Sequence, residues 1–160
     1  MPDYELVIVG ESDLEAVLDL YRRCEDFLAL GPQPFASREM VLADLAHSRE
    51  NGGVFYGIFP GGRLAGVPDL TESGWLGAPH CACLSLLMIA REQRGLGLGA
   101  RVLADVEARL RRQGVTRICG GVQVNNPQAV RFWQAHGFEI SLQARLQEDG
   151  TTTCDIEKHL

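Results

Sequence analysis

The hexapeptide RGLGLG at residues 94–99 is the most informative part of this sequence. An apolar run ends before it at Ile89, and a run with helical spacing follows it to residue 113. A strand, a glycine-rich turn and a helix N-terminus in this order form a place to hold phosphate. Glycine lets backbone N–H groups approach an anion, and the first turn of a helix offers unpaired donors. Arg94 adds a permanent positive charge.

The glycine-rich turn also has competing interpretations. The pattern Gly95-x-Gly97-x-x-Ala100 fits a dinucleotide site, but five residues separate the strand from the glycines. The acidic residue that such a site needs about 20 positions later is also missing. A P-loop requires Gly-Lys-Ser/Thr, and the only lysine of the chain is Lys158. A turn that merely packs a helix on a sheet stays possible from this stretch alone.

A second motif lies one helix and one strand further on. The stretch NPQAVRFWQAHGF occupies residues 126–138. It resembles the C-terminal signature of the GNAT acyltransferase superfamily at each of its positions: Asn126, Ala129, Phe132, Trp133, Gly137 and Phe138. The first stretch is similar to the acyl-CoA pyrophosphate loop of that superfamily, Arg/Gln-x-x-Gly-x-Gly, with Arg94, Gly97 and Gly99 in register. The resemblance is specific over residues 81–139 and extends to the first 80 in element order.

The resemblance implies an α/β chain with the GNAT fold, a mixed and mostly antiparallel sheet with helices on both faces. The patterns predict the order βααβββαβαββ in a single acyltransferase domain over residues 1–160. Strands are expected at residues 4–9, 54–59, 64–70, 81–89, 115–124, 138–146 and 151–159. Helices are expected from Ser12, which opens a capping box with Glu15, and over residues 37–48, 98–113 and 127–136. Pro68 is expected at a bulge or an unpaired edge.

The resemblance also implies that acetyl-CoA is the cosubstrate and assigns residues to it. The pyrophosphate is expected on the glycine-rich turn, formed by Arg94, Gly95, Leu96, Gly97, Leu98 and Gly99. The pantetheine arm is expected along the backbone of Leu87 and Ile89, with Asn126, Ala129, Phe132 and Trp133 lining its channel. The N–H of Leu87 is expected to act as a single-donor oxyanion hole for the thioester carbonyl.

The sequence departs from the family pattern at two catalytic positions. Trp133 stands where many members have a tyrosine that protonates the leaving thiolate, and an indole N–H is no acid near neutral pH. Cys83 stands where some members have a carboxylate base. The general base is therefore unassigned, and four titratable residues are candidates: Asp26, Asp69, Glu72 and His80. Asp26 and Asp69 are also candidates to recognise a cationic substrate.

The predicted function is acetyl-CoA-dependent transfer of an acetyl group to a primary amine, by direct attack in a ternary complex. The alternative is a non-catalytic domain of the same fold that binds or senses acyl-CoA. The acceptor is expected to be a small-molecule or peptide amine, and its identity and the length of the acyl group stay open. The protein is expected to be a monomer or a homodimer.

Composition limits the other possibilities. The chain has 160 residues, 46% hydrophobic and 22% charged, with a formal net charge of −6. An acidic balance argues against nucleic acid as a partner, and no apolar run is long enough to cross a membrane. Five cysteines, three of them in apolar runs, suggest free thiols in a reducing cytoplasm. No metal site is expected, because His80-Cys81-x-Cys83 lacks a second pair at zinc spacing.

Overall fold

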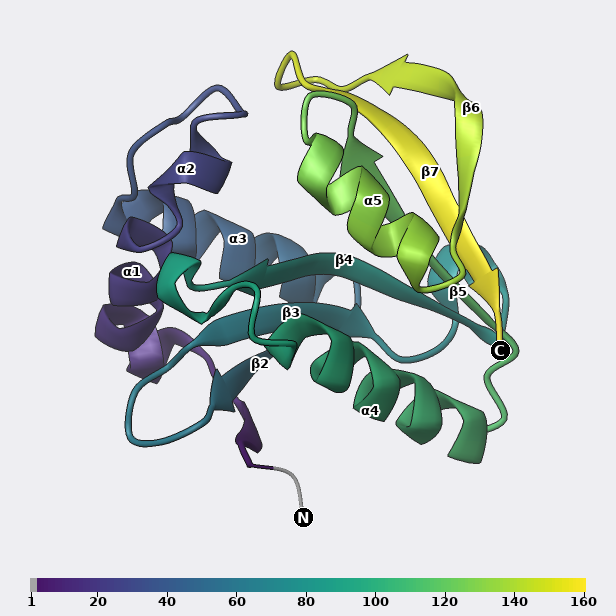
Figure 1. Ribbon diagram of the computed structural model, residues 1–160, viewed down its shortest axis with the longest axis horizontal. Coiled ribbons are helices and arrows are strands. Elements are labelled where there is room, and N and C mark those ends of the chain that lie inside the picture. Colours follow the sequence, from purple (N-terminus) through teal and green to yellow (C-terminus); the bar gives the residue numbers. More distant parts are fainter. Residues whose placement is uncertain (1–2) are drawn as a thin grey trace.

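The computed structural model describes residues 3–160 and contains one seven-stranded sheet (Figure 1). Its strand order is β1-β2-β3-β4-β5-β7-β6, and β4 and β5 are its parallel neighbours. The other strand pairs are antiparallel. The strands are β1 (Glu5–Ile8), β2 (Val54–Phe59), β3 (Gly66–Thr71), β4 (Cys81–Ile89), β5 (Arg117–Gln123), β6 (Glu139–Leu146) and β7 (Thr152–His159).

Helices cover both faces of the sheet, as the sequence predicts. They are α1 (Leu14–Arg22), α2 (Glu25–Leu28), α3 (Arg38–Glu50), α4 (Leu98–Arg112) and α5 (Pro127–Ala135). Buried side chains of α4 and α5 form one core cluster with the sheet, and those of α1 and α3 form a second. Within residues 3–160, no helix combines the length and the apolar content needed to span a bilayer.

Two of the expected helices, those over residues 37–48 and 127–136, begin with a side-chain cap. The Ser37 hydroxyl accepts a hydrogen bond from the N–H of Met40 at 3.1 Å, and Asn126 Oδ1 accepts one from the N–H of Ala129 at 3.1 Å. Each bond satisfies one of the donors that the first turn of a helix leaves unpaired. The four long helices, α1, α3, α4 and α5, follow one another in the predicted order.

The start of α1 and the segment after it differ from the prediction. The capping box at Ser12 is wrong, because a 3₁₀ turn over Glu11–Asp13 places Ser12 inside the turn, and the N–H of Gly10 donates to Asp13 Oδ2 at 3.0 Å. The short helix α2 was not expected, so the observed order is βαααβββαβαββ. Four residues are too few to show a helical period in the sequence.

Pro68 lies in an interior strand and not at an edge. It faces Leu87 of β4 in register, and the β2–β3 pairing is interrupted beside it, resuming at Ile58 and Gly66. The N–H of Ala90 donates to the carbonyl of Ala65, the residue before β3, at 2.8 Å. Since backbone groups alternate between the two edges of a strand, Pro68 directs its nitrogen toward the interrupted side. The missing donor of proline therefore removes no regular ladder bond.

The same alternation fixes the direction of the β4 backbone. Because Ala90 directs its N–H toward β3, the N–H groups of Ile89 and Leu87 face the opposite edge, toward β5. The β4–β5 pairing covers only Cys81–Arg117, Ala82–Ile118 and Cys83–Cys119. Beyond these pairs the two strands diverge (Figure 1). The second half of β4 therefore has an unpaired edge that faces a gap in the sheet.

Gly120 lies where the two strands begin to part. A Cβ added to Gly120 would lie 2.7 Å from the Leu84 carbonyl oxygen, so only glycine lets the two backbones approach this closely. The next residue, Gly121, has no such neighbour, because its added Cβ would lie 3.9 Å from the Cys154 carbonyl oxygen.

This pair of glycines gives a matched test of the fork. Gly120→Ala should lower the free energy of unfolding by about 1–3 kcal/mol, the usual cost of overpacking. Gly121→Ala should change it by less than about 0.5 kcal/mol. Urea unfolding followed by circular dichroism measures both values. Equal effects of the two substitutions would contradict a close approach of the strands at Gly120.

Candidate active site

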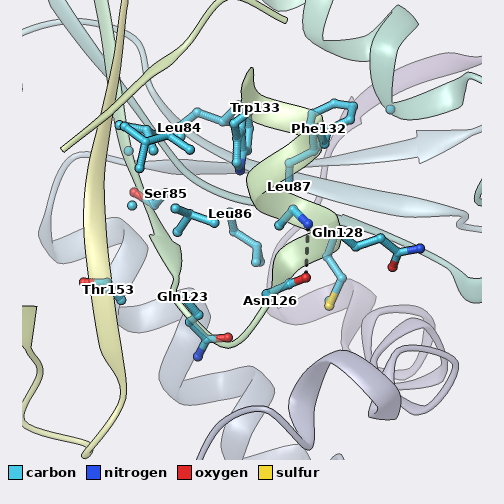
Figure 2. A pocket seen from close by; sticks show the side chains of 18 of the residues that line it. Leu84, Ser85, Leu86, Leu87, Gln123, Asn126, Gln128, Phe132, Trp133 and Thr153 are labelled. Atoms are coloured by element: carbon cyan, nitrogen blue, oxygen red, sulfur yellow. Dashed lines mark hydrogen bonds between the residues drawn. The ribbon is translucent and has the colours of Figure 1, made fainter. Parts of the chain in front are cut away.

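A cavity of about 1790 Å³ opens between the diverging strands β4 and β5. It is larger than the roughly 300–1,000 Å³ of a typical single-ligand site, so it has room for two substrates. Figure 2 shows the side chains of Leu86 and Leu87 on one wall, with Gln123 and Asn126 at the end of β5 and Phe132 and Trp133 on α5. The cavity brings together residues from both motifs of the sequence.

The β4 wall of the cavity carries the unpaired backbone. Leu87 and Ile89 line it, and their N–H groups face the gap between β4 and β5. The register between β3 and β4 shifts by one residue. Asp69 faces Leu86 whereas Leu70 faces Leu84, so Ser85 is an extra residue on β4. This bulge bends the strand locally and leaves Ser85 exposed in the cavity. No residue pattern in β4 signals the bulge.

The glycine-rich turn lies at one end of the cavity, where α4 begins. Gly97 is the N-cap of α4 and has a φ of +81°, a left-handed conformation that favours glycine. The N–H of Arg101 donates to the Gly97 carbonyl, so the preceding amides, Leu98 to Ala100, are the free donors of the first turn. Together with the positive end of the helix dipole, they form a site suited to an anion such as a pyrophosphate.

The leucines of this turn contribute differently from the glycines. Leu98 is buried in the core beneath α4, so only its backbone N–H is available to a ligand. Leu96 is 66% exposed and does not line the cavity. Gly95, Gly97 and Gly99 line it. The backbone of the turn, and not its leucine side chains, is the part suited to binding.

Arg94 has a structural partner within the protein. Its guanidinium forms an ion pair with Asp26 of α2 and its Nε donates to the Ile89 carbonyl at 2.8 Å. Partial burial raises the pKa of Asp26 and the Arg94 guanidinium lowers it, and the net result is a pKa below the ordinary value. Asp26 is therefore a poor base, and its charge is already matched, which argues against its role in recognising a cationic substrate.

The short helix α5 forms the opposite wall. Ala129 and Phe132 line the cavity, and Asn126 lines it while capping the helix. Trp133 is only 7% exposed, and its ring meets that of Phe138 edge-on at 4.8 Å between centroids. This packing gives Trp133 the role of a wall.

The three remaining candidates for a base lie outside the cavity. Asp69 is 8% exposed, accepts a hydrogen bond from the Ser48 hydroxyl at 2.5 Å, and has its pKa raised by burial. Glu72 accepts hydrogen bonds from Tyr56 and Gln113 and pairs with Arg109. His80 is exposed and does not line the cavity either. Asp69, Glu72 and His80 therefore make no contact with the space of the cavity.

Cys83 is no substitute for a carboxylate base. It lines the cavity, but burial raises the pKa of its thiol to about 11. Two of the carboxylates that line the cavity are engaged in ion pairs, since Arg117 pairs with Glu157 at 3.5 Å and Arg145 with Asp155 at 2.5 Å. Among the described residues, no cluster of three or more His, Cys, Asp or Glu side chains suits a metal ion.

Gln123 is a polar residue of the cavity that the sequence patterns did not predict as part of the site. Gln123 ends β5, and its side-chain oxygen Oε1 is buried without a hydrogen-bond partner within residues 3–160. Such an unpaired group costs about 1–3 kcal/mol in a folded protein. Its position between two valines, three residues before Asn126, could have marked it as a polar residue at the end of a strand.

Comparison with known families and structures agrees with this geometry. A sequence model of the Acetyltransferase (GNAT) family matches residues 14–138. The structure is similar to an acetyltransferase from Thermus thermophilus, with a TM-score of 0.83, 27% identity and coverage of 98% of this chain and 97% of that chain. Comparison with curated protein sequences finds no significant match.

Two further structures share the fold at lower identity. The putative acetyltransferase yncA from Salmonella typhimurium, solved with its cofactor acetyl-CoA, has a TM-score of 0.68 and 15% identity, with coverage of 99% and 95%. Ribosomal-protein-alanine N-acetyltransferase from Brucella melitensis has a TM-score of 0.71 and 20% identity, with coverage of 98% and 99%. The chain belongs to the GNAT family of acetyltransferases.

Two glycines at opposite ends of α4 test the anion site. Gly97 and Gly114 both have a left-handed φ, and a Cβ added to either meets no protein atom within 4 Å. Gly97→Ala and Gly114→Ala should therefore lose similar stability, about 1–2 kcal/mol of backbone strain. Only Gly97→Ala should weaken binding of CoA, by about tenfold or more, because its new methyl group points into the space of the anion.

Isothermal titration calorimetry with CoA measures the affinities, and thermal unfolding measures the stabilities. If Gly114→Ala weakened CoA binding as much as Gly97→Ala, the effect would come from strain in α4, and the turn would not be the anion site.

Proposed function

We propose that this protein transfers the acetyl group of acetyl-CoA to a primary amine, with both substrates bound together. The observation that supports this most strongly is the unpaired edge of β4, whose N–H groups at Leu87 and Ile89 face a cavity that ends at the anion site of α4. An extended arm with two amides can pair with such an edge as an added strand does.

The residues present fit the three chemical parts of acetyl-CoA. The free amides of the α4 N-terminus suit the pyrophosphate, and the backbone of Leu87 and Ile89 suits the pantetheine amides. The apolar side chains of Ala129 and Phe132 suit the walls of the arm's channel. When bound, acetyl-CoA supplies an acetyl group activated as a thioester.

The protein's contribution to the chemistry is orientation and one backbone donor. The N–H of Leu87 is suited to donate to the carbonyl oxygen as negative charge develops on it. The amine enters neutral and attacks the carbonyl carbon directly. We assign its proton to water, because three of the cavity carboxylates, Asp26, Asp155 and Glu157, are engaged in ion pairs and the other candidates from the sequence do not line the cavity. Water also supplies the proton of the leaving thiolate, whose pKa of about 8.5 makes it a tolerable leaving group.

A non-catalytic domain that binds or senses acyl-CoA is the second candidate. Trp133 and Cys83 at the two positions of family acids and bases favour it. For the acceptor, we propose an amine on a small molecule or a peptide, since the related Brucella enzyme is named for a protein alanine.

Acetyl-CoA should raise the melting temperature, whereas NADH and ATP should not. At about 100 times its dissociation constant the gain in the free energy of unfolding is roughly 2.7 kcal/mol.

With a panel of amines, the rate at which free CoA thiol is released should rise with pH in a single limb, because a protonated amine cannot attack. Stabilisation by acetyl-CoA without turnover of any amine would favour the non-catalytic candidate. Stabilisation by NADH or ATP alone would overturn both.

A further inference from the structure

Gln123 is a cavity residue with no part in the chemistry above. Its Oε1 atom is buried and has no partner among the described residues. A side-chain amide oxygen only accepts hydrogen bonds, so the group that completes it must be an N–H or O–H donor. Because buried polar atoms in proteins are nearly always paired, this oxygen gains a partner when the side chain turns it toward the cavity that Gln123 lines, where a bound ligand can supply the donor.

The position of Gln123 along β5 places it at the reacting end of the cavity. In the parallel β4–β5 pair, Cys81 faces Arg117 and Cys83 faces Cys119. The same offset continued beyond the fork brings Gln123 level with Leu87, to within about the one residue that the bulge adds to β4. Gln123 and the proposed oxyanion donor therefore stand on opposite sides of the gap (Figure 2).

The face of the sheet to which Gln123 points indicates which of the two substrates, the acceptor amine or acetyl-CoA, it contacts. Val122 is buried in the core cluster beneath α4 and α5, so Gln123 points toward the other face. There a Cβ added to Gly31 would lie 3.9 Å from both Gln123 Nε2 and a methyl group of Thr151. Gln123 thus borders the segment that follows α2 and the β6–β7 turn, away from the glycine-rich turn that suits the pyrophosphate.

We propose that Gln123 positions the acceptor amine, with Oε1 accepting a hydrogen bond from the attacking nitrogen. Holding one N–H in this way directs the nitrogen lone pair away from Gln123, across the gap toward the carbonyl at Leu87. Gln123 stays neutral, so it orients the amine and removes no proton. The inference rests on the proposed function, and the amides of the pantetheine arm, which have the β4 backbone as partner, are the competing donors.

Two variants distinguish the effect of the acceptor oxygen of Gln123 from the effect of the length and shape of its side chain. Gln123→Met keeps the length and removes the acceptor, whereas Gln123→Glu keeps an acceptor oxygen. Gln143→Met, on an exposed residue of β6 outside the cavity, is the matched control. The amines are 2-phenylethylamine, spermidine and a tetrapeptide with a free amino terminus, and the one with the highest kcat/KM is used for the variants.

Gln123→Met should lower kcat/KM for the amine by about tenfold or more, with the KM for acetyl-CoA changed by less than about twofold. Gln123→Glu should restore most of the loss, and Gln143→Met should have no effect. Calorimetric titration of the amine into the protein saturated with CoA should show the same tenfold weakening in Gln123→Met. This binding readout separates failure of the inference from failure of the proposed function, which would show as absent turnover in the wild type.

An unchanged kcat/KM and unchanged amine binding in a folded Gln123→Met variant would overturn the proposal. An equal rise in the KM for acetyl-CoA would also overturn it, because Gln123 would then contact the pantetheine arm. Loss of activity in Gln123→Glu equal to that in Gln123→Met would assign the residue a packing role instead.

Discussion

The parting of β4 and β5 is the constraint on which the rest of the structure depends. The two strands pair through three residues each and then separate, with Gly120 at the fork. Backbone groups that lose a partner inside a protein must find another or remain in water. The fork therefore creates the unpaired donors of β4 and the cavity that gives a ligand access to them.

An ion pair and a hydrogen bond connect the segments around this fork. Arg94 joins the glycine-rich turn to Asp26 of α2. Asn125 Nδ2 donates to the Leu30 carbonyl at 3.0 Å and so joins the end of β5 to the segment after α2. Both interactions involve the short helix α2 or the segment just after it, at Asp26 and Leu30. The segment from α2 to Leu30 thus contacts both sides of the cavity.

Much of the fold could be predicted because it depends on local patterns. The apolar period of α4 and the cap at Asn126 act over a few residues, and both were correct. Most residues that the motif at residues 126–138 and the glycine-rich turn assign to acetyl-CoA line the cavity, and their role in binding stays a prediction. The bulge at Ser85 could not be predicted, because it depends on how β3 pairs with β4 and leaves no mark in either strand alone.

The charged candidates were harder to predict for the same reason. Asp26 and Asp69 were singled out for their chemistry, yet their partners Arg94 and Ser48 are distant in the sequence and are brought together only by the fold. Gln123 was missed because a neutral amide at a strand end is common. Only the missing partner of its buried oxygen distinguishes it.

The central claim is that the unpaired edge of β4 is the binding surface for acetyl-CoA. Amide hydrogen exchange, followed residue by residue by NMR with and without acetyl-CoA, tests it most directly. Exchange should slow at Leu87 and Ile89, together with the amides of the first turn of α4, because each gains an acceptor from the ligand. Unchanged exchange at Leu87 and Ile89 in the presence of saturating acetyl-CoA would contradict it.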